Sequence, residues 1–448
     1  MTSLARKLGT MDYFTLAFGT MVGVGWLVVM DDWLQRGGPL GAMLAFTIGS
    51  LAVAPIGYIY GRLVMAIPDA ASEIAYTQKA FPPWVSFATG WMMTLAYLIV
   101  CPWEAVAVGK IAAYLFPRLN SLPLYDVAGQ PVYLPHLLLG LALICLVTWL
   151  NYQGIRLSAN FQNWMTFTLL GLFFLFGTLC IQHGSAHNFL PLFSHGSLVS
   201  ILLVLQIVPY FLTGFEAVPK CAEEARPEFR SRGYFRAIML ALATGGLFYV
   251  AVIGVVSYVQ PWRSLIHESF ATSVAFERAF HSRLLVSMVF AAALASLLKV
   301  CNGNFLAASR LLFALGREGY VNPRVGRIHP VKLTPSNAVF CAGAFGLVGA
   351  LLGEAILVPI TEVGSFASAI GWLAACASYL CIEENWRRRS IALLGLAVCA
   401  ALILMKFLPS VPGHFTIYEY TALAAWIGIG IAARRRGPRG PCGKEGRL

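Results

Sequence analysis

The stretch Gly19-Thr20-Met21-Val22-Gly23-Val24-Gly25-Trp26 decides how this chain folds. It lies inside an apolar segment, Tyr13 to Met30, that is long enough to cross a bilayer as a helix. Three closely spaced glycines weaken that helix, at roughly 1 kcal/mol each relative to alanine. Because unpaired backbone groups are costly in hydrocarbon, such a break persists only beside protein or a water-filled cavity. The stretch therefore predicts a broken membrane helix at a binding site.

Composition places the rest of the chain in a membrane as well. Hydrophobic residues make up 58% of it and charged residues 12%, with a mean hydropathy of +0.72, which is outside the range of soluble domains. Twelve apolar segments are predicted to span the bilayer, and they leave no room for a soluble catalytic domain. They cover residues 11–34, 40–66, 84–116, 133–151, 160–182, 199–222, 235–259, 284–316, 337–354, 357–381, 391–408 and 415–433.

The positive charges of the chain are divided unequally between the two sides of these segments. If both termini are cytoplasmic, the cytoplasmic segments hold 24 of the 32 lysines and arginines, which is the positive-inside pattern. The net charge of +12 therefore indicates topology and lipid contact rather than nucleic acid, and the basic tail, residues 434–448, is expected near anionic lipid. We expect an integral protein of the cell membrane, of the bacterial inner-membrane type, with both termini cytoplasmic.

A second interrupted segment follows about 190 residues after the first. Residues 209–219 read PYFLTGFEAVP, with two prolines and a glycine around a glutamate, and a proline in a helix interior costs about 3 kcal/mol. Paired breaks in two halves of a chain are typical of secondary transporters built from inverted repeats. Residues 11–182 and 199–381 would then be the two repeats, followed by two further helices within 391–433, all in one domain, 1–448. The alternative is that the glycines permit close helix packing and the prolines merely kink the helix.

Motifs at both segments resemble those of the amino acid, polyamine and organocation transporter superfamily. The first segment is similar to that family's G-x-x-x-G-S-G-I-F motif, and residues 211–216 are similar to its F-x-T-G-F-E motif. Other landmarks follow in the same order: Ile67-Pro68 with Glu73 and Tyr76, Asn151-Tyr152-Gln153-Gly154-Ile155, Ala222-Glu223-Glu224, and Ala308 to Ala314. The resemblance implies an all-α membrane protein of the leucine-transporter type, with twelve helices, a 5+5 inverted repeat with helices 1 and 6 broken, and two C-terminal helices. It also implies an amino acid permease, a symporter or antiporter of an amino acid or related amine.

The backbone at the two breaks is predicted to bind such a substrate. The free amides of Gly23, Val24 and Gly25, aided by the half-helix dipole, suit a carboxylate. The carbonyls of Met21, Tyr210 and Thr213 suit an ammonium group, and Phe211 and Gly214 belong to the same predicted site. Val24 stands where the family usually has serine, which removes one hydroxyl contact. Tyr210 is either an aromatic gate over the substrate or a packed side chain.

Two glutamates within predicted spans are further candidates, because burying a charge in a membrane is costly. Glu104, near the middle of the third span, is expected to face the cavity and favour substrates with a positive or hydrogen-bonding side chain. Its alternatives are a proton site or an ion pair with Lys110 or Lys299. Glu216 matches the family glutamate and is expected to cap freed amides of the sixth span, with proton transfer as the alternative.

The coupling machinery is where the chain departs from its relatives. Proton-coupled members of the family often carry a lysine in the fifth span, and the corresponding position here is Leu169. Lys299, near the middle of the eighth span, is predicted to replace that lysine, holding the first helix when charged and releasing it when neutral, since burial disfavours the charged form. A static ion pair with Glu104 or a bound carbonyl cluster is the alternative role. Proton coupling or exchange would follow, with a sodium-coupled or polyamine carrier as alternatives.

A polytopic membrane enzyme or receptor is the competing class of protein. An enzyme needs nucleophiles or metal ligands clustered at one membrane face, but the ten cysteines and eight histidines of this chain have no such spacing. The glycines at 19–25 lack the preceding strand of a dinucleotide-binding loop. We therefore predict a transporter with no catalytic residues, cofactor or metal.

Overall fold

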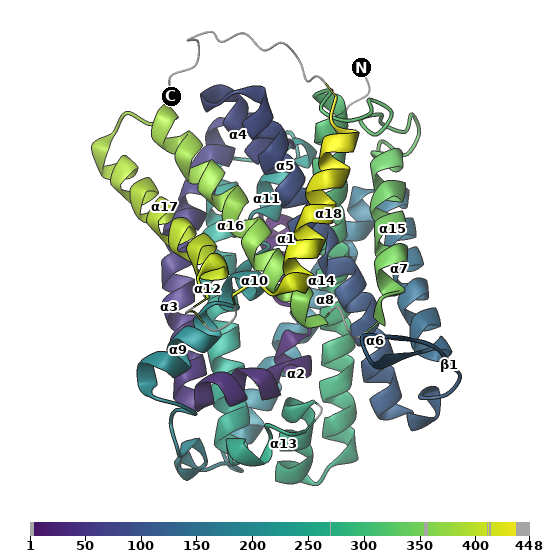
Figure 1. Ribbon diagram of the computed structural model, residues 1–448, viewed down its shortest axis with the longest axis vertical. Coiled ribbons are helices and arrows are strands. Elements are labelled where there is room, and N and C mark those ends of the chain that lie inside the picture. The colour runs from purple at the N-terminus through teal and green to yellow at the C-terminus, as the bar shows by residue number, and fades with distance from the viewer. Residues whose placement is uncertain (1–3, 269, 354–356, 410, 412–413, 436–448) are drawn as a thin grey trace.

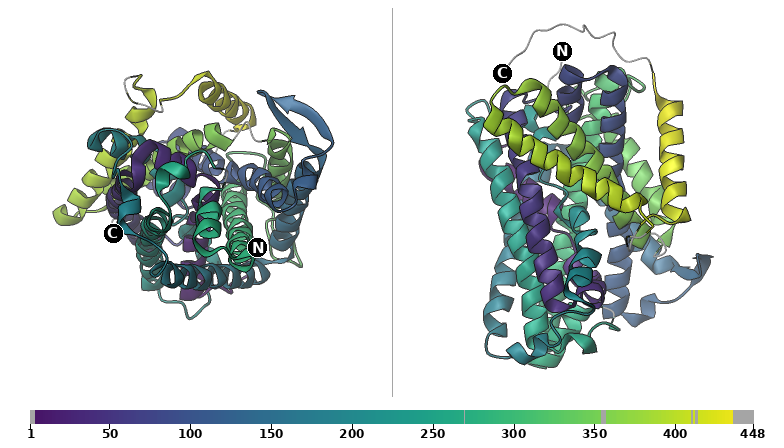
Figure 2. Two further views of the ribbon diagram at one scale, coloured as in Figure 1. Left: turned by 90° about the horizontal axis from the view of Figure 1, so that it is seen from below. Right: turned by 60° about the vertical axis from the view of Figure 1, so that its left-hand side comes forward.

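The computed structural model describes residues 4–435 except 269, 354–356, 410 and 412–413. Long helices running side by side make up nearly all of this part of the chain (Figures 1 and 2). The helices of the first half are α1 (Thr10–Met21), α2 (Gly25–Val28), α3 (Met30–Ala66), α4 (Glu73–Ala80), α5 (Pro83–Leu98), α6 (Val100–Leu115), α7 (Leu134–Gln153) and α8 (Ile155–Cys180). Those of the second half are α9 (Ser197–Leu205), α10 (Val208–Leu212), α11 (Ala217–Lys220), α12 (Arg232–Val259), α13 (Ala271–Phe280), α14 (Arg283–Arg317), α15 (Ser336–Ala350), α16 (Leu357–Ile382), α17 (Trp386–Phe407) and α18 (Ile417–Ala433).

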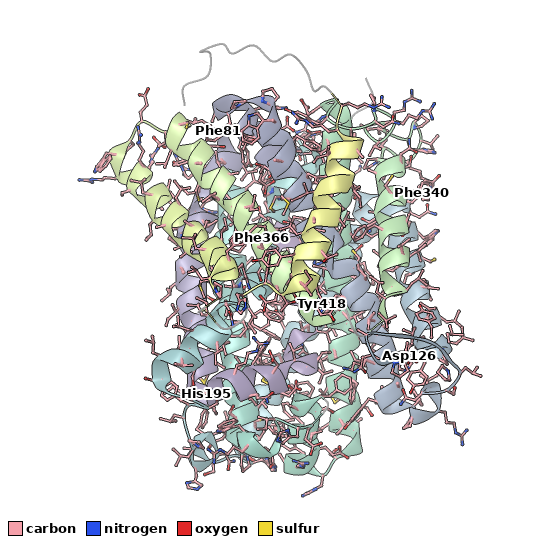
Figure 3. The ribbon with its side chains drawn as sticks, viewed as in Figure 1. Phe81, Asp126, His195, Phe340, Phe366 and Tyr418 are labelled. Carbon is pink, nitrogen blue, oxygen red and sulfur yellow. The ribbon has the colours of Figure 1, made fainter. Side chains whose placement is uncertain are left out.

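Short elements connect these helices. Single 3-10 turns occupy Pro117–Leu119, Ala186–Phe189, Ala222–Glu224 and Trp262–Ser264. An antiparallel hairpin of β1 (Pro123–Val127) and β2 (Gln130–Tyr133) joins α6 to α7. Figure 3 shows Asp126 of this hairpin at one edge of the molecule and His195 at the opposite edge.

Nine helical segments in the described part of the chain are long and apolar enough to cross a membrane. Here α1 with α2, and α5 with α6, each count as one segment. Two further apolar helices, α15 and α18, are shorter, and the predicted sixth span is divided among α9, α10 and α11. Each predicted span contains helix, but α8 begins at Ile155, earlier than the predicted residue 160. Gly154, with φ +136°, separates it from α7 and allows the chain to reverse at once.

The centre of the molecule forms around α1 and α14. Helix α1 packs against α8, α12 and α14, and α14 also packs against α5 and α6. Helices α16 and α17 lie against each other, and α16 also packs on α5. The last helix attaches to α5 through a stacked pair of indoles, Trp91 and Trp426, with ring centroids 4.5 Å apart. Each indole N–H of that pair donates to the other residue's carbonyl. This packing leaves the two chain breaks facing each other in the interior.

Candidate functional site

The first break separates α1 from α2 at residues 22–24. Val22 has φ −92° and ψ 96°, so the helix stops there and leaves carbonyls without helical partners. Side chains of α14 take their place: Ser296 Oγ donates to Gly23 O at 2.7 Å and to Val22 O at 3.2 Å. The broken segment is therefore held from one side by α14.

The second break separates α10 from α11 at residues 213–216. Gly214 has φ +136°, a conformation that favours glycine. Its amide donates to Glu216 Oε2 at 3.0 Å, the contact expected of a cap on a freed amide. A Cβ added at Gly214 would lie 2.6 Å from Met21 N and 2.7 Å from the carbonyl carbon of Thr20. The two breaks thus meet backbone to backbone.

A small cavity lies beside both breaks. It includes seven of the nine predicted binding residues, namely Met21, Gly23, Gly25, Glu104, Tyr210, Phe211 and Thr213. The other two do not line it: Val24 is fully buried, and Gly214 packs on the backbone of Thr20 and Met21. The remaining lining residues are Thr20, Ala96, Val100, Trp103, Val300, Asn304 and Ser368.

Thr20, Asn304 and Ser368 are polar residues of this lining that were not predicted as site residues from the sequence. Asn304 Nδ2 donates to Thr20 O at 3.1 Å, and the Thr213 hydroxyl donates to Ser368 Oγ at 2.9 Å. Asn304 lies between Lys299 and the Ala308 motif, so a polar residue one turn beyond Val300 was a signal available in the sequence. Ser368 stands in an apolar helix rich in small residues and carries no comparable signal.

Aromatic side chains cover the cavity around Gly25. A Cβ at Gly25 would lie 2.5 Å from Phe211 Cε1, so the Phe211 ring occupies the space beside that glycine. The Tyr210 ring stands edge-on to Phe211 at 5.2 Å and rests against α16 at Gly364. Tyr210 is partly exposed to the cavity and packed against a helix, so both predicted roles remain compatible with its position.

Glu104 is the charged side chain of the cavity lining, and it is 2% exposed. Its Oε1 lies 3.1 Å from the position of a Cβ at Gly23. Its Oε2 has no hydrogen-bond partner in the described part of the chain. The carboxylate therefore reaches the first helix break rather than a neighbouring helix.

Lys299, on α14, also contacts the first break and is fully buried. Its ammonium donates to the carbonyls of Gly19, at 3.4 Å, and Val22. It also lies 5.4 Å from the centroid of the Phe18 ring. Between these two described side chains no ion pair forms, so Lys299 binds the freed end of α1 and not Glu104. On α8, Leu169 is an apolar, buried residue.

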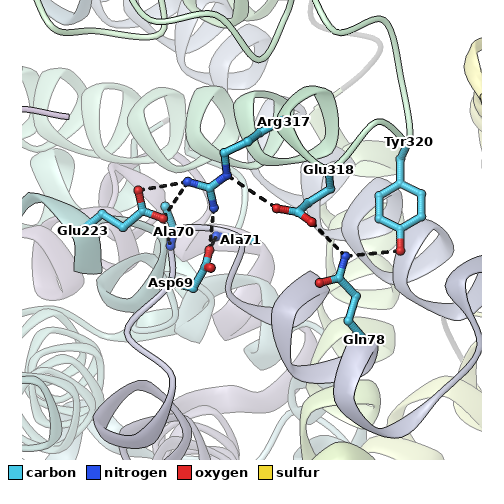
Figure 4. A network of polar contacts seen from close by, with 8 residues as sticks. All are labelled: Asp69, Ala70, Ala71, Gln78, Glu223, Arg317, Glu318 and Tyr320. Carbon is cyan, nitrogen blue, oxygen red and sulfur yellow. Dashed lines mark hydrogen bonds and ion pairs between the residues drawn. The ribbon is translucent and has the colours of Figure 1, made fainter. Parts of the chain in front are cut away.

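Several ion pairs lie near the face where α1 begins, which is called here the terminal face. Two pairs are almost fully buried: Lys220 with Glu73, and Arg310 with Glu224, both at 2.7 Å. Nearer the surface, Arg317 joins Glu223, Asp69 and Glu318 (Figure 4). Gln78 extends this network from Glu318 to Tyr320.

Because Arg310 is buried and Arg317 is partly exposed, we expect different losses of stability when the ion pairs of each arginine are removed. Arg310→Gln leaves Glu224 charged and buried, a change that costs about 3–5 kcal/mol of stability. Arg317, 29% exposed, belongs to pairs that are each worth about 1 kcal/mol or less. We expect Arg310→Gln to lower the thermal unfolding midpoint of the purified protein clearly more than Arg317→Gln. Equal shifts would show that the buried pair carries no special weight.

Breaks that meet at a cavity inside a helical membrane bundle define an integral membrane transporter, and comparison with known proteins agrees. The amino acid permease family model matches residues 8–432. The chain therefore belongs to the amino acid permease family, within the superfamily that its motifs resemble, and it is a transporter and not an enzyme.

The sequences of several known proteins align with most of this chain at low identity. The branched-chain amino acid permease BcaP of Bacillus subtilis (strain 168) is 24% identical over 83% of this chain and 79% of its own length. The methylthioribose transporter of the same organism is 24% identical over 96% and 92%. A probable GABA permease of Pseudomonas aeruginosa is 25% identical over 77% and 72%. The substrates after which these relatives are named differ, so the comparison indicates a transporter of a small molecule without identifying that molecule.

Proposed function

We propose that the chain carries an amino acid or a related amine across the cytoplasmic membrane by alternating access. The observation that carries this proposal is the cavity at the two helix breaks. A backbone donor is available there, because the amide of Gly25, which lines the cavity, donates to no acceptor in the described part of the chain. A substrate carboxylate would satisfy it in a site shielded from lipid. Glu104 and the backbone around Tyr210 and Thr213 offer acceptors for an amino group.

The architecture that fits this function has twelve spans. The nine long segments, the two shorter helices α15 and α18, and the interrupted run from α9 to α11 together supply that number. Residues 11–182 and 199–381 would form the inverted repeats, with breaks in the first helix of each. Helices α17 and α18 would be the appended pair within 391–433. The excess of positive charge supports a cytoplasmic terminal face. The predicted basic tail, 434–448, lies outside the described residues apart from Arg434 and Arg435.

We propose that Lys299 couples substrate transport to proton binding or to exchange, and that Glu216 caps the second break. The Lys299 ammonium, bound to the carbonyls of Gly19 and Val22, ties α14 to the end of α1. Loss of its proton would remove that attachment and free α1 to move. Proton symport or exchange follows from this role, whereas a sodium-coupled carrier would have no need of an ammonium group at this point.

Uptake by purified protein in proteoliposomes tests the proposed function. We expect saturable uptake of at least one radiolabelled member of a panel that includes leucine, 4-aminobutyrate and putrescine, above that of protein-free liposomes. Thermal stabilisation of the detergent-solubilised protein by the same compound would show direct binding. A panel of common amino acids and amines that gives neither uptake nor stabilisation would contradict the proposal.

A further inference from the structure

The acceptors that α1 leaves free at its break are already used by the chain's own side chains. Thr20 O accepts from Asn304 Nδ2 at 3.1 Å, and Met21 O accepts from the Tyr249 hydroxyl at 3.1 Å. The next two carbonyls are held by Ser296 and Lys299. The carbonyl of Met21, expected from the sequence to receive the substrate ammonium, therefore has an internal donor instead.

Glu104 offers the acceptor that these carbonyls do not. Its carboxylate lines the cavity, is 2% exposed and keeps Oε2 without a partner in the described part of the chain. Its Oε1 lies beside Gly23, which lines the cavity at the first helix break. A buried carboxylate without a partner is neutralised either by taking up a proton or by pairing with a cationic hydrogen-bond donor, and the protonated amine of a substrate in the cavity would be such a donor.

The basic group nearest to Glu104 does not supply that donor. Lys299 donates to the carbonyls of Gly19 and Val22. No other lysine, arginine or histidine belongs to the cavity lining formed by the described residues. In the described part of the chain, the other titratable groups that interact with Glu104 are the hydroxyl groups of Tyr210 and Tyr249 and the thiol of Cys301.

We propose that Glu104 binds the amino group of the substrate itself, and so makes a protonated amine the required feature of every substrate of this carrier. This inference rests on the proposed function and makes it more specific. It assigns Glu104 to the group that all substrates share, whereas the sequence assigned it to the variable side chain. Gly23 belongs to the same binding site, because a Cβ at this position would lie only 3.1 Å from Glu104 Oε1 and 3.2 Å from Val300.

Binding of matched probe sets by the full-length protein tests the inference. One set is leucine, 4-methylpentanoate, which lacks the amine, and 3-methylbutylamine, which lacks the carboxylate. A second set is 4-aminobutyrate, butyrate and propylamine. We expect the unaltered protein to bind the amine-bearing probes at least about tenfold more tightly than the deaminated acids, because a probe without the amine leaves the buried carboxylate without its charged partner.

Two variants and one control locate the source of that preference. In Glu104→Gln we expect the ratio between amine and deaminated probe to fall to about twofold or less. Gly23→Ala provides a second route if Glu104→Gln does not fold, and should weaken binding of amines more than that of the acids. Glu419→Gln makes the same chemical change on α18, where the carboxylate caps Thr416, and should leave the ratio unchanged.

The outcomes separate this inference from the proposed function. If the unaltered protein neither binds nor transports any probe of a wide panel, the proposed function fails. If it binds amines selectively and both cavity variants keep that selectivity, the role of Glu104 is refuted while the transporter stands. A preserved amine preference in Glu104→Gln together with an altered pH profile of uptake would make Glu104 a proton site and would equally overturn the inference.

Discussion

Replacing Gly214 with alanine is expected to abolish uptake and to destabilise the protein. The residue holds φ +136° between α10 and α11, where an L-amino acid is strained by about 1–3 kcal/mol. The added methyl group would also lie 2.6 Å from Met21 N. That neighbour is a backbone atom and cannot rotate away, so one of the two broken segments must shift. The cavity between them would lose its shape.

Uptake in proteoliposomes and thermal unfolding in detergent measure the two effects of Gly214→Ala. Gly171→Ala is the matched control, because a Cβ at this position of α8 meets nothing within 4 Å. The control should retain uptake and the original unfolding midpoint. Transport by Gly214→Ala at the rate of the unaltered protein would show that the contact between the breaks is not needed for function.

Replacing Lys299 with methionine is expected to remove the pH dependence of uptake while substrate binding persists. Methionine keeps much of the side-chain volume but carries no proton, so the carbonyls of Gly19 and Val22 lose their charged donor at every pH. The ammonium does not line the cavity, and binding of the substrate is therefore expected to survive. Initial uptake rates measured from mildly acidic to mildly alkaline pH, beside equilibrium binding at one pH, check this result.

Two further experiments test the role of Lys299 in coupling: transport by the Lys299→Arg variant, and the effect of sodium on uptake by the unaltered protein. Arginine keeps its charge throughout this range, so it should hold α1 and slow transport without restoring the pH response. A methionine variant whose uptake follows the same pH profile as the unaltered protein would remove Lys299 from coupling. Sodium-stimulated uptake by the unaltered protein would do so as well.

The features that the sequence determined are those set by local chemistry. Hydropathy identified a membrane protein, and the nine long apolar helices agree with it. Gly23 and Gly25, and the prolines and glycine of residues 209–219, predicted both helix breaks, because backbone conformation depends on the residue and its immediate neighbours. The family also followed from short motifs, each read within one segment.

Only the tertiary structure decided which groups the breaks present to the cavity. Gly214 turned out to lie against the backbone of α1, Phe211 covers Gly25, and Ser368 joins the lining from a helix without any sequence signal. Lys299 reaches the carbonyls of α1, and among the described residues Glu104 has no ion-pair partner. Such contacts depend on how each helix is rotated about its axis and on residues more than a hundred positions apart. Hydropathy cannot fix that rotation in a bundle whose interior and exterior are both apolar.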